Sequence, residues 1–185
     1  MRNIYPLAAL DDVLADVETA RRKGEENFDG SGWTDVHAIE QPTTSFETLD
    51  VSVQQIVDVL TPIMPQVKRF YATIGSYMRD NPGSADRDPY GSYNDDAVCF
   101  GFGSRCFIKI ETREPYVHSI WFQAEASNPT ELEALAAGLA AINGVVPCAV
   151  ADYWLDEAGS LSDKGFTDRY YGLLREGEAP SQIER

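Results

Sequence analysis

The chain has 185 residues and a formal net charge of −15, from 30 Asp and Glu against 15 Lys and Arg. This length favours a single domain that buries its own core without a disulfide or metal staple. The negative charge disfavours binding to nucleic acid or to an anionic membrane, because both require clustered Lys and Arg. The negative charge therefore favours a cationic partner, although a negative surface also keeps a protein soluble without any partner.

Neither a targeting signal nor the spacing of the cysteines indicates a special compartment. No stretch has the length of a signal-peptide core or the ~18 apolar residues of a membrane span, so we expect a cytoplasmic protein that does not bind membranes. Cys99, Cys106 and Cys148 are odd in number and lack C-x-x-C spacing. Buried free thiols are favoured over a disulfide or metal site, and no cofactor is predicted.

The negative charge is concentrated in two segments. Residues 24–67 and 116–163 contain no Lys or Arg, whereas residues 79–114 are nearly balanced. The acids of the two segments are Glu25, Glu26, Asp29, Asp35, Glu40, Glu47, Asp50 and Asp58, then Glu125, Glu131, Glu133, Asp152, Asp156, Glu157 and Asp163. This distribution predicts an acidic surface, provided that the fold brings the segments together.

In the first half of the chain, apolar spacing predicts two helices. Apolar residues three and four apart, with basic residues in the last turn, predict an amphipathic helix over 7–23. Asp50 or Ser52 is placed to cap a second helix over 53–60. The rest of this half is predicted as irregular over 25–44, helical over 67–78 and a long exposed loop over 80–96.

The second half alternates strands and helices. Three runs rich in aromatic and β-branched residues predict an antiparallel meander, and Asn128 is placed to cap a helix that starts with Pro129. The predicted elements are strands over 97–102, 105–111 and 116–124, a helix over 129–143, a strand over 145–151 and a helix over 163–174. Together they predict a single α+β domain over 1–176, with an antiparallel-rich sheet of about four strands packed with three to four helices, and a disordered tail over 177–185.

Residue types for catalysis are scarce. The only histidines are His37 and His118, and His118 alternates with apolar residues of a predicted strand, which favours a structural role. No nucleophile, zinc or phosphate-binding motif occurs. We therefore predict a protein that is not an enzyme. The alternative is a small hydrolase or ligand-binding domain that uses His118 or Asp152 in a cleft beside the sheet.

Two loops instead alternate acids with aromatic residues, which is typical of a protein interface. Aromatic side chains supply buried area there, and carboxylates raise the association rate with a cationic partner. The predicted partner-binding residues are Asp86, Asp88, Tyr90, Tyr93, Asp95, Asp96, Trp154, Asp156 and Glu157. The alternative for Tyr153 and Trp154 is that they cap the core at the end of a strand.

The order of features over 116–174 has a counterpart in a known family. A strand, the helix that starts with Pro129, the turn Asp152-Tyr153-Trp154 and a D-x-x-x-x-D-R-Y helix from Asp163 follow one another. This order resembles the immunity proteins of bacterial polymorphic-toxin and contact-dependent growth inhibition systems. The resemblance implies a small cytosolic α+β protein without catalysis, which binds one cognate toxin domain, often a basic nuclease, and blocks its active site or substrate path.

The sequence thus predicts a non-catalytic, acidic, antitoxin-like immunity protein that neutralises a basic toxin domain. A second alternative is a nucleic-acid mimic that occupies a host DNA-binding protein. Its carboxylates would then be spaced like phosphates along a ridge.

Overall fold

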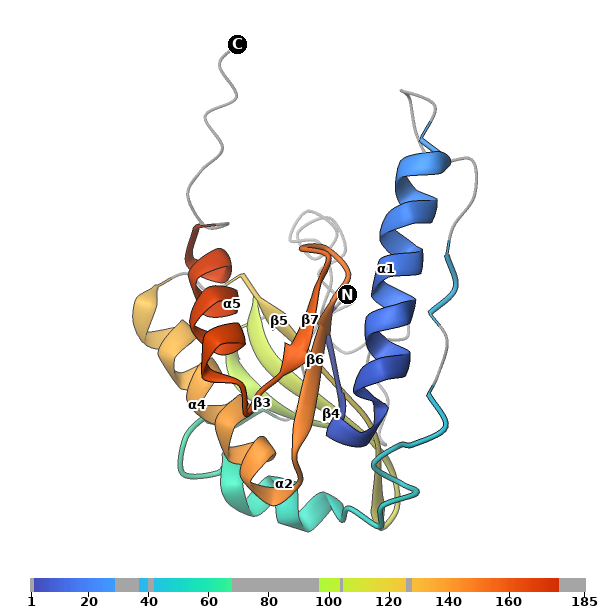
Figure 1. Cartoon of the computed structure of the whole chain (residues 1–185). Helices are drawn as coiled ribbons and strands as arrows, with labels where there is room; N and C mark the ends of the chain where they lie inside the picture. Colours follow the sequence, from blue (N-terminus) through green and yellow to red (C-terminus); the bar gives the residue numbers. More distant parts are fainter. Residues whose placement is uncertain are drawn as a thin grey trace, which may run out of the picture.

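The computed structural model describes residues 2–28, 37–39, 42–67, 97–103, 105–125 and 128–176 (Figure 1). These residues form one antiparallel sheet and four α-helices, which confirms the predicted α+β class. In chain order the elements are β1 (Arg2–Pro6), a 3-10 turn (Leu7–Ala9), α1 (Leu10–Glu26), α2 (Val53–Leu60), β2 (Gln66–Val67), β3 (Ala97–Gly103), β4 (Cys106–Arg113), β5 (Tyr116–Ala124), α4 (Pro129–Val145), β6 (Cys148–Asp152), β7 (Glu157–Ser160) and α5 (Lys164–Glu176).

The sheet is larger than predicted. Its order is β2-β3-β4-β5-β1-β6-β7, so it has seven strands rather than about four, β2 being only two residues long. The meander β3-β4-β5 and the strand β6 were predicted, whereas β1, β2 and β7 were not. β1 pairs with β5 through Ile4 and Ile120 and with β6 through Ile4 and Val150, so the N-terminal strand lies inside the sheet. The pairing of β1 depends on residues far away in the chain, which local sequence patterns do not indicate.

The main core lies between the sheet and three helices. α2, α4 and α5 pack on one face, and the residues beneath them include Ile108, Ile120 and Val150. Gly138 of α4 allows this close packing: a Cβ there would lie 3.1 Å from Ile108 and from Met64. α4 therefore sits directly on β4 and α2.

Helix α1 covers the opposite face of the sheet. Val13 and Val17 of α1 form a second apolar cluster with Tyr5 and Ala151, and in Figure 1 α1 stands on the other side of β6 and β7 from α4 and α5. Neighbouring strand residues point to opposite faces, so Val150 joins the main core while Ala151 contacts α1. The predicted amphipathic helix is confirmed, with its start moved to Leu10.

The predicted starts of α2 and α4 are confirmed by their caps. Asn128 Oδ1 accepts the Glu131 backbone N–H at 3.0 Å, with Pro129 in the first turn of α4. At α2, Ser52 and Gln55 form a reciprocal capping box, so Ser52 rather than Asp50 caps this helix. The strand predicted over 145–151 begins later, at Cys148, because α4 extends to Val145.

Several predictions lie outside the described residues. These are the loop 80–96, the tail 177–185 and the helix over 67–78, of which only Val67 is described and lies in β2.

Cys99, Cys106 and Cys148 are buried free thiols, as predicted, and burial raises the pKa of Cys99 to about 11 and that of Cys148 to about 12. Among the described helices, none combines the length and apolarity that crossing a membrane requires.

Gly101 provides a test of the β3–β4 pairing. A Cβ at this position would lie 2.5 Å from the Cys106 carbonyl oxygen and 2.7 Å from the Phe107 Cα, and backbone atoms cannot move aside. We expect Gly101→Ala to lower the free energy of unfolding by about 3 kcal/mol, measured by urea denaturation. Gly144→Ala is the matched control, because nothing lies within 4 Å of its Cβ. Equal midpoints for the two variants would contradict this packing.

Candidate functional site

The turn after β6 is held by one buried carboxylate. Asp152 is fully buried. Its Oδ2 accepts hydrogen bonds from Arg2 Nε at 2.7 Å and from the Tyr170 hydroxyl at 3.0 Å. Its Oδ1 accepts the backbone N–H groups of Trp154 at 3.0 Å and Leu155 at 3.3 Å. A single side chain thus connects β1, β6, α5 and the turn.

The surroundings of Asp152 also act on Tyr170. Burial raises the pKa of the Tyr170 hydroxyl, and the negative charge of Asp152 raises it further. The hydroxyl therefore stays protonated and acts as a donor throughout the physiological range. Arg2 and Asp152 form an ion pair whose side chains are 8% and 0% exposed, so water does not screen it.

Trp154 projects from this fixed turn. Its side chain is 58% exposed, although both its backbone N–H and the next one are bound by Asp152. The Arg2 guanidinium carbon lies 4.9 Å from the centroid of the indole, at cation–π distance. The ring is thus exposed to solvent and yet supported from within the fold.

A groove runs beside Trp154 along the second half of α1. We call it the aromatic groove; it has a volume of about 680 Å³, and its lining residues are Ala20, Arg21, Gly24, Glu25, Phe28, Tyr153, Trp154 and Asp156. Phe28, at the end of α1, is 54% exposed. Two large aromatic side chains from segments far apart in the sequence therefore border the same hollow.

The charges of the aromatic groove are partly paired. Arg21 donates to Glu18 at 2.6 Å and to Glu25 at 2.8 Å, and the bond to Glu18 is the main cause of the raised Arg21 pKa. Glu25 and Asp156 belong to the two different segments that lack Lys and Arg, and both line this groove. The aromatic groove is therefore one place where acids of the two segments border the same hollow.

Most other acids of these segments lie elsewhere. Asp58 is in α2, Glu131 and Glu133 are in the first turns of α4, and Asp152 is buried. Glu47 lies beside the β4–β5 hairpin, with Oε2 3.4 Å from Arg113. The described carboxylates are therefore distributed over several elements, and of those named here Glu25 and Asp156 border the aromatic groove.

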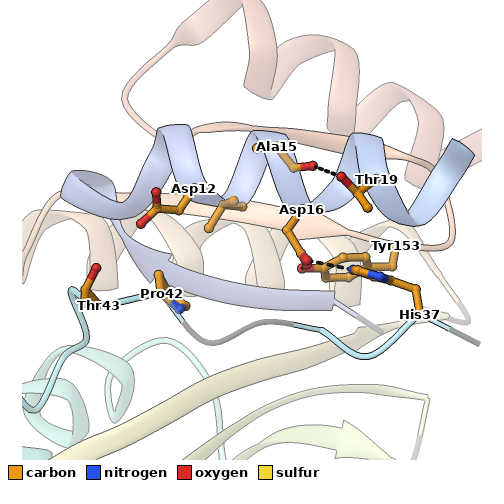
Figure 2. Close-up of a pocket in the computed structure, with 9 residues that line it drawn as sticks. Asp12, Ala15, Asp16, Thr19, His37, Pro42, Thr43 and Tyr153 are labelled. Atoms are coloured by element: carbon orange, nitrogen blue, oxygen red, sulfur yellow. Dashed lines mark hydrogen bonds and ion pairs between the residues drawn. The ribbon is translucent and has the colours of Figure 1, made fainter. Parts of the chain in front are cut away.

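A second hollow follows the first half of α1. We call it the His37 cavity; it has a volume of about 410 Å³, and its lining residues are Asp12, Val13, Ala15, Asp16, Thr19, His37, Pro42, Thr43 and Tyr153. Figure 2 shows Asp16 reaching from α1 toward His37 and Tyr153. Asp16 Oδ1 lies 2.7 Å from His37 Nε2, and Oδ2 accepts the Tyr153 hydroxyl at 2.6 Å.

This polar cluster was missed by the sequence analysis. Burial and the hydrogen bond to Asp16 raise the pKa of Tyr153, which therefore remains a donor. The sequence feature that could have indicated this cluster is Asp16, because it lies between Val13 and Val17 on the inward side of α1. A carboxylate beside an apolar stripe needs hydrogen-bond partners when the helix packs.

The predicted partner-binding residues divide into three groups. Trp154 and Asp156 line the aromatic groove. Glu157 does not; it accepts a hydrogen bond from Arg169 at 2.9 Å. The remaining six lie outside the described residues: Asp86, Asp88, Tyr90, Tyr93, Asp95 and Asp96. Of Tyr153 and Trp154, Tyr153 packs against the α1 cluster, as the alternative interpretation predicted, whereas Trp154 does not.

The structure does not bring His118 and Asp152 together. Asp152 is in register with Arg2 and Phe122, and His118 lies four residues before Phe122 on β5. At ~3.3 Å per strand residue, this places the two roughly 13 Å apart along the sheet. His118 is 42% exposed and lies 3.6 Å from Glu47, so a site that combines His118 with Asp152 in one cleft is not formed.

Comparisons with known proteins add no assignment. No protein-family model, no curated protein and no solved structure matches the chain. Within the described ranges, no group of three or more His, Cys, Asp or Glu side chains could hold a metal ion. The resemblance to immunity proteins therefore stays a prediction.

Tyr170 tests the network around Asp152. Tyr170→Phe removes a donor to a buried, ionised carboxylate, and we expect the free energy of unfolding to fall by about 2 kcal/mol. Tyr171→Phe is the matched control, because its hydroxyl has no hydrogen-bond partner among the described residues; we expect a change below about 0.5 kcal/mol. Urea denaturation measures both. Equal losses would show that Asp152 does not depend on Tyr170.

Proposed function

We propose that the protein is a non-catalytic immunity protein, antitoxin-like in action, which binds and neutralises a cognate basic toxin domain such as a nuclease. The aromatic groove is the docking surface in this proposal. Its partner covers Trp154 and Phe28 and places basic side chains near Glu25 and Asp156.

The observation that carries the proposal is an exposed tryptophan on an immobilised turn. Trp154 is 58% exposed. Its backbone N–H donates to Asp152, and its indole ring lies at cation–π distance from Arg2. An aromatic side chain that is already ordered loses little conformational entropy when a partner buries it. Tryptophan and tyrosine are also the residue types that contribute most at protein interfaces.

Charge supports the choice of a basic partner. The chain carries −15 overall, and Arg21, the one basic side chain among the described residues that line the groove, is already paired with Glu18 and Glu25. A long-range negative field raises the rate of encounter with a cationic protein. The aromatic side chains then supply the buried area that slows dissociation.

The same geometry disfavours the hydrolase alternative. Each oxygen of Asp152 already accepts two hydrogen bonds, and the side chain is fully buried. A general base needs a lone pair within reach of a substrate proton. Inhibition by covering a surface requires no such group.

Trp154 gives the direct test. The test requires a toxin gene beside that of this chain, and the C-terminal domain of its product is purified and titrated by isothermal calorimetry. Absence of such a gene would count against the proposal. We expect Trp154→Ala to raise Kd by at least about 30-fold, equivalent to ~2 kcal/mol, mainly through faster dissociation. Phe102→Ala is the control, because Phe102 is 43% exposed on β3 and does not line the groove. Equal Kd values for both variants would exclude the aromatic groove as the docking surface.

Ionic strength tests the electrostatic part separately. Stopped-flow association with the same toxin domain at 50 and 500 mM NaCl should show a rate constant that falls at least about tenfold at high salt. The dissociation rate should change much less, because it reflects the buried aromatic contacts. An association rate that is indifferent to salt would contradict a basic partner.

A further inference from the structure

The His37 cavity and the aromatic groove are neighbours on one helix. The cavity is lined by α1 residues between Asp12 and Thr19, and the groove by α1 residues from Ala20 onward. Tyr153 lines both hollows. From Asp12 to Glu26 the α1 surface extends ~21 Å at 1.5 Å per residue. A partner docked over Trp154 therefore lies within reach of the cavity.

The lining of the cavity is acidic. Asp12 and Asp16 contribute carboxylates, and no Lys or Arg is among the described lining residues. Asp12 is exposed at the rim and has no ion-pair or hydrogen-bond partner within the described part of the chain. A group that enters this cavity meets two carboxylates and is therefore selected for positive charge.

His37 adds an unused hydrogen-bond acceptor. Its side chain is only 10% exposed, and its Nε2 donates to Asp16 because a carboxylate can only accept. In the neutral ring Nδ1 is then an acceptor, and it is buried without a partner among the described residues. Buried polar atoms without partners are rare in folded proteins and favour a site that a ligand completes.

The apolar part of the lining defines the shape of the occupant. Val13, Ala15 and Pro42 offer apolar contact between the rim and the polar cluster. Long basic side chains have this composition, with a methylene stem and a charged end that carries only donors. Nδ1 has no solvent-exposed surface in the free protein, so a donor reaches it only when the atoms that cover it are displaced.

We infer that the His37 cavity is a specificity subsite that receives one Lys or Arg side chain of the protein partner. The inference rests on the proposed function and names the chemistry by which the same surface recognises its partner. The stem packs on Val13 and Pro42, and the charged end lies between Asp12 and His37. A free small cation in the same cavity is the competing outcome.

The first experiment needs no toxin. We expect saturable amide shifts confined to residues 12–19 and His37 when ethylguanidinium or n-butylammonium chloride is titrated into the 15N-labelled full chain at constant ionic strength. Asp12→Asn should weaken this binding at least about fivefold, because it removes the charge at the rim. Asp11→Asn is the matched control, since Asp11 is exposed on the same helix turn but does not line the cavity. Absence of saturable shifts, or equal weakening by both variants, overturns the inference.

The second experiment separates a partner side chain from a free cation. In the complex with the toxin domain, Asp12→Asn should raise Kd by about tenfold and Asp11→Asn by less than about twofold. If the toxin binds and the two variants are equal, the subsite is wrong while the proposed function stands. If ethylguanidinium binds but the toxin domain does not, the cavity is a small-cation site, and both the partner side chain and the proposed function are excluded.

Discussion

The ion pair between Arg2 and Asp152 is the constraint on which the rest of the structure depends. Its partners are 150 positions apart, and removing both charges from water costs free energy that their attraction and further hydrogen bonds must offset. The Tyr170 hydroxyl and two backbone N–H groups of the following turn complete the hydrogen bonds of Asp152. Arg2 Nη1 is buried without a hydrogen-bond partner among the described residues. The first strand, the last helix and the turn are therefore positioned by one carboxylate.

Stability and recognition consequently share the same atoms. The groups that satisfy Asp152 include the backbone of Trp154, and the cation that neutralises it lies 4.9 Å beneath the indole. An exposed aromatic ring is ordinarily mobile, because nothing but solvent surrounds it. Here the Arg2 guanidinium lies against the ring, so the side chain loses its conformational entropy during folding rather than on binding. The docking surface in the proposed function is an extension of the core.

Local patterns were sufficient for elements whose signals are local. Asn128 with Pro129 marked the start of α4, and alternating acids and aromatic residues found Trp154 and Asp156. β1 was not predicted, because its five residues gain their strand character from β5 and β6, more than a hundred residues away. Phe28 and His37 were missed for the same reason: α1 must pack on the sheet before they reach the turn after β6.

The internal position of β1 has a consequence for biosynthesis. β1 is synthesised early, yet its neighbours in the sheet are β5 and β6, and Asn3 is in register with Trp121 and Ala151. At ribosomal speeds of about 5–20 residues per second, β1 waits on the order of ten seconds before β6 emerges. During that interval the backbone edge of β1 that pairs with β6 is unpaired, and the sheet closes only when nearly the whole domain has left the ribosome.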